Sequence, residues 1–168
     1  MTPIVSVVGR SNSGKTYLLE RLIPHLTSKG YRIATVKHDV HGFEIDREGK
    51  DSWRHKAAGA SAVVLASPKK IAVVKDLQEE WSLERIRSAW IQDADLILTE
   101  GYKRADYPKI EVSLFGDRTE LLCTPEDQLI AVVSNRPWTV GVPVFPESEI
   151  HRLADLLERL FLRGPGTT

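Results

Sequence analysis

The sequence predicts an α/β fold, a mostly parallel sheet flanked by helices, and three observations support this prediction. Strand and helix signals alternate along the 168 residues. Short β-branched runs such as residues 4–8 (IVSVV) are of the kind that parallel sheets bury. A glycine-containing segment joins this run to an apolar helical pattern at residues 17–23. Because parallel strands need crossover connections, this order is typical of one α/β domain, which we expect to span residues 1–168.

The glycine-containing segment carries the first chemical signal. Residues 9–16 read GRSNSGKT and match G-x-x-x-x-G-K-[ST], the Walker A phosphate-binding pattern. Glycine lets the backbone curl around phosphate oxygens, while the loop N–H groups and the start of the following helix attract the anion. The lysine can reach the phosphates, and the threonine hydroxyl can bind Mg²⁺. The pattern predicts a P-loop NTPase fold with a nucleotide site at Gly9, Arg10, Ser11, Asn12, Ser13, Gly14, Lys15 and Thr16.

The elements that follow the loop can be assigned in order. The first helix is expected to end near Lys29, with Gly30 as its C-terminal cap. Pro24 lies inside it and should kink the helix or remove one backbone hydrogen bond. A strand, a polar loop and a second helix are then predicted, at residues 32–37, 38–49 and 50–60.

Two apolar runs then interrupt the alternation of strands and helices. Residues 62–66 and 71–75 are separated only by Ser67-Pro68-Lys69-Lys70, so we expect an inserted hairpin. An exposed apolar edge invites pairing with another chain. We therefore expect a homodimer in which two hairpins pair about a two-fold axis. The alternative is that the hairpin extends the sheet of its own chain.

The second half of the chain continues the same alternation. A helix is predicted at residues 79–90, with Trp81, Ile86, Ala89 and Trp90 as candidates for its inner face. Buried strands are predicted at residues 96–98, 129–133 and 142–145. An amphipathic helix is expected at residues 150–162 with Ser148 as N-cap, followed by a loose tail at residues 163–168.

Acidic residues near the carboxyl ends of strands are the candidate magnesium ligands. Glu100 follows the strand LIL, at the edge where open α/β sheets bind ligands. Asp95 lies at the other end of that strand and is less favoured. Asp51 and Asp46 follow the second strand and could supply a further acid, or either could cap the next helix. The candidate metal ligands are therefore Thr16, Glu100 and one of Asp51 and Asp46. The alternative for Glu100 is a surface residue in a turn.

Several polar residues remain as further candidates. Lys37, His38 and His41 follow the second strand and could contact phosphate, or they could belong to a solvated loop. The pattern N-K-x-D is absent, and Asn135 is the candidate contact to a nucleotide base, unless Ser-Asn-Arg-Pro is an ordinary turn. Three basic residues form either a rim for an anionic ligand or solubilising charge: Lys103, Arg104 and Lys109.

Composition limits the class of protein. The chain has 23 basic and 23 acidic residues, and this balance argues against a nucleic-acid surface. The single cysteine, Cys123, excludes an internal disulfide and is expected to be a small buried hydrophobe. Signal-peptide and membrane-spanning patterns are absent from the sequence. We therefore expect a cytoplasmic protein without a membrane or nucleic-acid partner.

At this point the residues resemble one family, the molybdopterin-guanine dinucleotide biosynthesis adaptor proteins, MobB. The resemblance runs from residue 4 to about residue 112. It rests on GRSNSGKT with LLERLIP, VKHD, DREGKDSWRHKAAGA, and DLILTEGYK followed by PKIEV. Asn12 departs from some relatives, which have a third glycine there. That departure leaves the exact conformation of the loop open.

The resemblance implies a function. It implies a protein with a Walker-type α/β domain that binds GTP and Mg²⁺, has weak GTPase activity, and assists the enzyme that attaches GMP to molybdopterin. It also implies Thr16, Asp51 and Glu100 as the magnesium residues. The implied partners are the molybdopterin guanylyltransferase, with molybdopterin and apo-molybdoenzymes as further candidates, and dimers occur in the family.

Two other readings share the same loop. A small-molecule kinase or ligase of the dethiobiotin synthetase type would use the same phosphate and magnesium residues. A metal-delivery GTPase is less favoured, because the chain lacks a cysteine pair and a histidine-rich tract. No catalytic residue is assigned, since neither a glutamine base nor an arginine finger is evident, although Arg10 lies in the loop.

Overall fold

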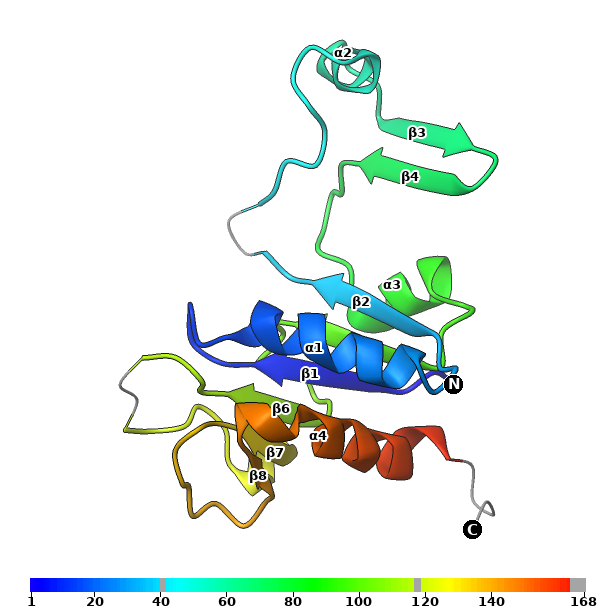
Figure 1. Ribbon diagram of the computed structural model, residues 1–168. Coiled ribbons are helices and arrows are strands. Elements are labelled where there is room, and N and C mark those ends of the chain that lie inside the picture. Colours follow the sequence, from blue (N-terminus) through cyan, green and yellow to red (C-terminus); the bar gives the residue numbers. More distant parts are fainter. Residues whose placement is uncertain (40–41, 117–118, 164–168) are drawn as a thin grey trace. The chain divides into compact units, whose positions relative to one another are not determined.

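The structure is a computed structural model that describes residues 1–39, 42–116 and 119–163 (Figure 1). It divides into two units. Residues Met1–His38 and Ile91–Thr168 form one, which we call the sheet unit, and residues Asp39–Trp90 form the other, which we call the hairpin unit. His41 and residues 164–168 of the expected tail lie outside the described residues. The expectation of one domain over residues 1–168 stays a prediction.

The sheet unit is built on a parallel sheet. Within the described residues, six strands pair in the order β2-β5-β1-β6-β7-β8, and every pair is parallel. The prediction of a mostly parallel sheet is therefore confirmed. The strands are β1 (Ile4–Val8), β2 (Ile33–Lys37), β5 (Leu96–Glu100), β6 (Lys109–Val112), β7 (Leu129–Val133) and β8 (Val144–Phe145).

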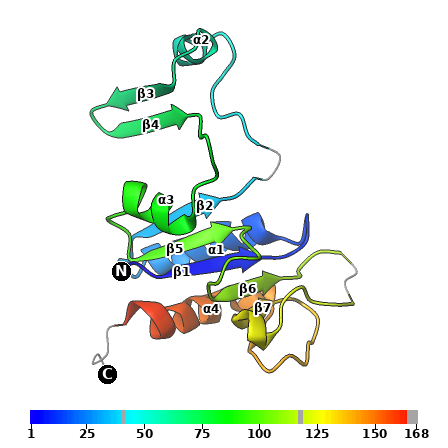
Figure 2. The same ribbon diagram turned by 180° about the vertical axis from the view of Figure 1, so that it is seen from behind.

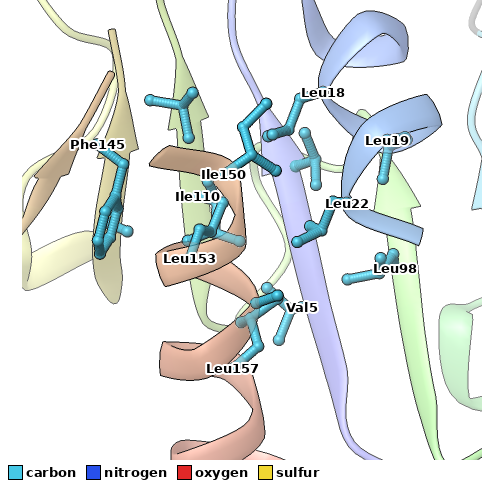
Figure 3. Close-up of a cluster of buried hydrophobic side chains, with 14 of the residues drawn as sticks. Val5, Leu18, Leu19, Leu22, Leu98, Ile110, Phe145, Ile150, Leu153 and Leu157 are labelled. Atoms are coloured by element: carbon cyan, nitrogen blue, oxygen red, sulfur yellow. The ribbon is translucent and has the colours of Figure 1, made fainter. Parts of the chain in front are cut away.

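Two helices cover one face of this sheet. Helix α1 (Lys15–Thr27) and helix α4 (Ile150–Leu157) lie side by side over it (Figures 1 and 2). Their buried leucines meet the apolar side chains of the strands, and each buried leucine stabilises the fold by about 1.5–3 kcal/mol. Figure 3 shows this core, which includes Val5, Leu18, Leu22, Leu98, Ile110, Leu153 and Leu157.

A smaller cluster packs around Cys123. Its buried members are Val8, Cys123, Leu129 and Val132. Cys123 is 6% exposed, and burial, together with the nearby charges of Glu111 and Asp127, raises the pKa of its thiol to about 11. A neutral thiol among apolar side chains matches the small buried hydrophobe that the sequence predicts.

Strand β6 was not predicted, because it carries charges at buried positions. Lys109 and Glu111 alternate with apolar residues, yet both side chains are buried. The Lys109 ammonium donates to the carbonyl oxygens of Tyr107, at 3.1 Å, and Asp127, at 2.8 Å. Burial raises the pKa of Glu111, while the N–H groups of Leu122 and Cys123, which donate to its carboxylate, favour the charged form. Each buried charge thus has partners, as burial requires.

Several element ends differ from the predictions. Helix α1 ends at Thr27, and Gly30, with φ of 90°, donates its N–H to the Thr27 carbonyl oxygen. The final strand is β8, shorter than residues 142–145. Helix α4 is followed by a π-helical turn, η3 (Glu158–Leu162). Its N-cap is Glu149, not Ser148, because Ser148 lies inside a 3-10 turn, η2 (Glu147–Glu149).

The described part of the hairpin unit contains two helices and the hairpin. They are α2 (Asp51–Ala57), β3 (Ala62–Ser67), β4 (Lys70–Lys75) and α3 (Leu83–Trp90). The antiparallel hairpin is confirmed. It forms a two-stranded sheet of its own in the described chain, so the alternative that it extends the main sheet is wrong. Three large apolar side chains of the hairpin are exposed: Val64, Leu65 and Ile71.

Helix α3 is shorter than predicted and presents a different face. Ser82 accepts the backbone N–H of Arg85 and so caps the helix just before Leu83. Leu83 is its buried residue, whereas Ala89 and Trp90, predicted for the inner face, are exposed. Among the described residues, no helix is both long enough and apolar enough to cross a membrane.

Candidate functional site

The phosphate loop joins β1 to α1 and depends on two glycines. Gly9 and Gly14 adopt φ angles of 150° and 102°. A Cβ atom on Gly9 would lie 2.5 Å from the Ser13 hydroxyl oxygen and 2.6 Å from the Val112 carbonyl oxygen. A Cβ atom on Gly14 would lie 3.1 Å from the Phe115 ring. Both positions therefore require glycine, as a tightly curled loop predicts.

Lys15 begins helix α1 and turns its side chain back over the loop. Its ammonium donates to the carbonyl oxygens of Gly9, at 3.2 Å, and Arg10, at 2.9 Å. These contacts hold a positive charge at the loop, beside the N-terminal end of the helix. An anion bound there would meet both the ammonium and the helix dipole.

Ser13 is a further indication that the loop can donate hydrogen bonds to a bound anion. Its hydroxyl oxygen is buried, and among the described residues it is the buried side-chain polar atom that has no hydrogen-bond partner. Leaving such a hydroxyl unpaired costs about 1–3 kcal/mol. The hydroxyl oxygen lies next to Gly9 across the loop, while the Ser13 backbone carbonyl oxygen accepts the N–H groups of Leu114 and Phe115. The donor set of the loop therefore fits a phosphate group.

The three residues at the tip of the loop are exposed. Arg10, Ser11 and Asn12 all belong to this tip. Asn12 adopts φ of 57°, the left-handed conformation that asparagine tolerates better than most residues. This left-handed position of the loop is thus occupied by a residue that is neither β-branched nor bulky.

Thr16 and Glu100 meet although 84 residues separate them. The Thr16 hydroxyl lies 3.1 Å and 3.0 Å from the two carboxylate oxygens of Glu100. Thr16 lies in the first turn of α1 and Glu100 is the last residue of β5, so the fold joins the loop to the neighbouring strand. A hydroxyl and a carboxylate at this edge are oxygen ligands of the kind that Mg²⁺ prefers.

The segment after Glu100 is tightly fitted. Gly101 adopts φ of 103°, and a Cβ atom there would lie 3.3 Å from the Cβ of His38. The His38 ring stacks on Tyr102, with ring centroids 4.6 Å apart. The His38 N–H donates to the Glu100 carbonyl oxygen, and Lys37 is paired with Glu100 in the strand register. Lys37 and His38 therefore lie beside Glu100, as their place after the second strand suggests.

The other acidic candidates differ in their surroundings. Asp51 is the first residue of α2, and its side chain is 90% exposed and 3.9 Å from Arg54. Asp46 accepts the N–H of Arg47. Both belong to the hairpin unit, so their part in a metal site stays a prediction. Asp95 is held by the Arg32 guanidinium, which lowers its pKa to about 2.

The prediction of a basic rim is wrong for one of its three residues, Lys109. Lys109 is buried at the start of β6, where its ammonium is engaged by backbone carbonyl oxygens. Its charge therefore serves the fold and not a surface for anions. Lys103 and Arg104 are exposed, which leaves both of their earlier interpretations open.

Asn135 lies in a group of residues that sequence reasoning mostly missed. Its side-chain oxygen accepts the Glu147 N–H at 2.9 Å. The Tyr17 hydroxyl in turn donates to the Glu147 carboxylate. The Tyr17 and Phe115 rings form a T-shaped pair with centroids 5.4 Å apart, and the Arg21 guanidinium lies 3.3 Å from the Tyr17 ring centroid. The available signal for Tyr17 was its place directly after the GKT motif.

Comparisons with known proteins agree on one family. The chain matches the family described as Molybdopterin guanine dinucleotide synthesis protein B, MobB, over residues 4–135. It is 35% identical over 157 residues to the molybdopterin-guanine dinucleotide biosynthesis adapter protein of Haemophilus influenzae, covering 93% of this chain and 88% of that protein. It is 34% identical to the Escherichia coli adapter protein of the same name, covering 94% of this chain and 92% of that protein.

Solved structures support the same assignment. A crystal structure of molybdopterin-guanine biosynthesis protein B is similar with a TM-score of 0.74 and 32% identity, covering 95% of this chain and 99% of that one. The crystal structure of Bacillus subtilis MobB has a TM-score of 0.73 and 30% identity, covering 96% and 99%. This likeness confirms the P-loop NTPase fold class. By family match, sequence identity and fold together, the chain belongs to the MobB family of molybdopterin-guanine dinucleotide biosynthesis adapters.

Proposed function

We propose that this MobB protein binds GTP with Mg²⁺ at the phosphate loop and assists the attachment of GMP to molybdopterin. The observation that carries the proposal is the pairing of an anion-ready loop with the Thr16–Glu100 contact. The loop supplies Lys15, two obligatory glycines and an unpaired buried hydroxyl on Ser13. Thr16 and Glu100 supply the oxygen ligands at the adjoining strand. The proposed preference for guanine is what the resemblance to MobB proteins implies.

The residues present fit the proposed magnesium ion. Thr16 and Glu100 would hold it, directly or through water. Asp51, which belongs to the hairpin unit, stays a predicted further acid. Mg²⁺ commonly keeps several waters and binds few protein carboxylates, so a set of this size is sufficient. The ion would neutralise phosphate charge.

Hydrolysis of GTP by the isolated chain is expected to be slow. The loop offers positioning and charge neutralisation, but no residue is assigned as the base that orients an attacking water. We therefore expect a turnover below about 1 per second, the low end of the range usual for enzymes. Arg10, exposed in the loop, remains the candidate for a charge-stabilising arginine.

The proposed assembly is argued from the hairpin. Val64, Leu65 and Ile71 are exposed on it, and burying such side chains against a second copy would cover an apolar surface. A homodimer that docks on the molybdopterin guanylyltransferase is the proposed working form, in the cytoplasm. Molybdopterin and apo-molybdoenzymes are the further proposed partners. Light scattering at micromolar concentration that gives a monomer mass would reject the dimer.

The proposal is tested by nucleotide binding and turnover in one series. Calorimetric titrations with GTP and ATP, each with and without Mg²⁺, should show tight binding of GTP that requires the ion for full affinity. Turnover of each nucleotide should stay slow whether or not small acceptor substrates are added. Fast, acceptor-dependent turnover of ATP would instead support the kinase or ligase of the dethiobiotin synthetase type.

A further inference from the structure

Three residues from distant parts of the sheet unit meet beside the phosphate loop. Asn135 follows β7 and Glu147 follows β8, and these neighbouring strands are parallel, so both residues lie at the carboxyl edge of the sheet. The Asn135 side-chain oxygen accepts the Glu147 N–H at 2.9 Å. The Tyr17 hydroxyl donates to the Glu147 carboxylate across 130 residues of sequence.

This contact ties the group to the nucleotide site. Tyr17 directly follows Thr16 in helix α1. Its ring has two neighbours that restrict it, the T-shaped contact with the Phe115 ring and the Arg21 guanidinium over the Tyr17 ring. Phe115 also lies against Gly14 of the loop. A side chain locked in this way can place the Glu147 carboxylate at a fixed position relative to the phosphate loop.

We propose that Glu147 reads the guanine base, with Asn135 beside it and Tyr17 as a positioning residue. This inference rests on the proposed function, because it assigns the base contacts of the same GTP site. Guanine presents two adjacent donors on one edge, the N1–H and the N2 amino group. A carboxylate has two acceptor oxygens with about four lone-pair sites, so it can accept both donors while it keeps the Tyr17 hydroxyl.

The same arrangement rejects other bases. Adenine places an acceptor at N1, which would face the carboxylate oxygens without a proton between them. The Asn135 oxygen is already occupied by the Glu147 N–H, so the Asn135 amide keeps its NH₂ group as a donor. That donor suits the O6 and N7 acceptors of guanine and not the N6 amino group of adenine.

A purely structural role for the group makes a different prediction. If Glu147 only joined the ends of β7 and β8 to α1, changing it would alter the stability of the fold and weaken all nucleotides alike. A base reader instead changes the ratio of affinities between nucleotides that differ at one ring position.

The test is a calorimetric panel of GTP, ITP, XTP and ATP with Mg²⁺. Wild-type protein should bind ITP, which lacks the N2 amino group, roughly tenfold more weakly than GTP, because one hydrogen bond to a charged acceptor is lost. XTP carries an acceptor at that position and should bind more weakly still. Equal affinities for GTP and ITP would overturn the inference without any variant.

Glu147→Gln sharpens the test. Its amide can donate to the O2 acceptor of xanthine but can no longer accept both guanine donors, so the GTP-to-XTP preference should fall by roughly tenfold or more. Tyr17→Phe should lower the affinity for GTP severalfold and reduce the GTP-to-XTP preference, because the Glu147 carboxylate loses the hydrogen bond from the Tyr17 hydroxyl. The matched control is Glu149→Gln. Glu149 lies in the same turn but is paired with Arg152, so this variant should leave the GTP-to-XTP preference unchanged.

The outcomes separate the two claims. A wild-type protein that binds none of the four nucleotides would overturn the proposed function, and this inference with it. A wild-type protein that prefers GTP, with the same preference retained in a folded Glu147→Gln variant, would overturn only the assignment of the base reader.

Discussion

Lys15→Ala removes the positive charge that the structure places at the phosphate loop. The ammonium lies 2.9 Å from the Arg10 carbonyl oxygen and 3.2 Å from that of Gly9, so it is already positioned where a phosphate would bind. Losing one charge-assisted contact in a partly desolvated site costs about 2–4 kcal/mol. The triphosphate affinity should therefore fall by about 30- to 900-fold.

The same change should leave the fold intact. The Lys15 side chain is only half-buried, and its partners are carbonyl oxygens of a loop, so unfolding free energy should change by less than about 0.5 kcal/mol. Calorimetry gives the affinity, and thermal unfolding without nucleotide gives the stability. The control is Lys69→Ala, which removes the same charge from the exposed turn between β3 and β4.

Two results would refute this reasoning. Unchanged triphosphate affinity in Lys15→Ala would mean that the loop does not use this charge. An equal loss in Lys69→Ala would mean that binding depends on overall charge and not on the loop.

The remaining predictions address the metal, an ion pair and the thiol. Glu100→Gln and Asp51→Asn should each raise the Mg²⁺ concentration needed for turnover by roughly 10- to 100-fold, and this effect should exceed their effect on metal-free nucleotide binding. A variant whose magnesium titration equals that of the wild-type protein would exclude its residue as a ligand. Arg32→Ala should lower the free energy of unfolding at pH 7, because Arg32 lowers the pKa of Asp95 in the folded state from 3.8 to about 2. This loss should be complete above about pH 4 and should vanish when unfolding is measured at pH values down towards 2. The thiol of Cys123, with its pKa raised to about 11, should react slowly with a thiol reagent at pH 8 and quickly after unfolding, and equal rates in both states would contradict its burial.

The sequence predicted most of the sheet and the phosphate loop because their signals are local. A β-branched run, a fixed glycine spacing and an apolar helical pattern each lie within a few neighbouring residues. Strand β6 was not predicted because Lys109 and Glu111 are residue types that are usually exposed. Their partners are backbone groups that lie far away in the sequence. The hairpin was predicted from its short turn. That its strands pair with each other and not with the six-stranded sheet of the described residues depends on tertiary structure, which a local pattern does not carry.

The site was predicted unevenly for the same physical reason. Thr16 and Glu100 were placed by general rules about loops and strand ends, and the structure brings them together. Tyr17 and Glu147 were missed because the signal that joins them is a tertiary contact over 130 residues. Asp51 remains a prediction, since it belongs to the hairpin unit.

The most direct test of the account is the association of this chain with the molybdopterin guanylyltransferase, measured by pull-down with and without GTP and Mg²⁺. The account predicts association that GTP strengthens in the wild-type protein, and no strengthening in Lys15→Ala. Absence of association in every condition, or an association that GTP does not change in the wild-type protein, would contradict a GTP-dependent adapter.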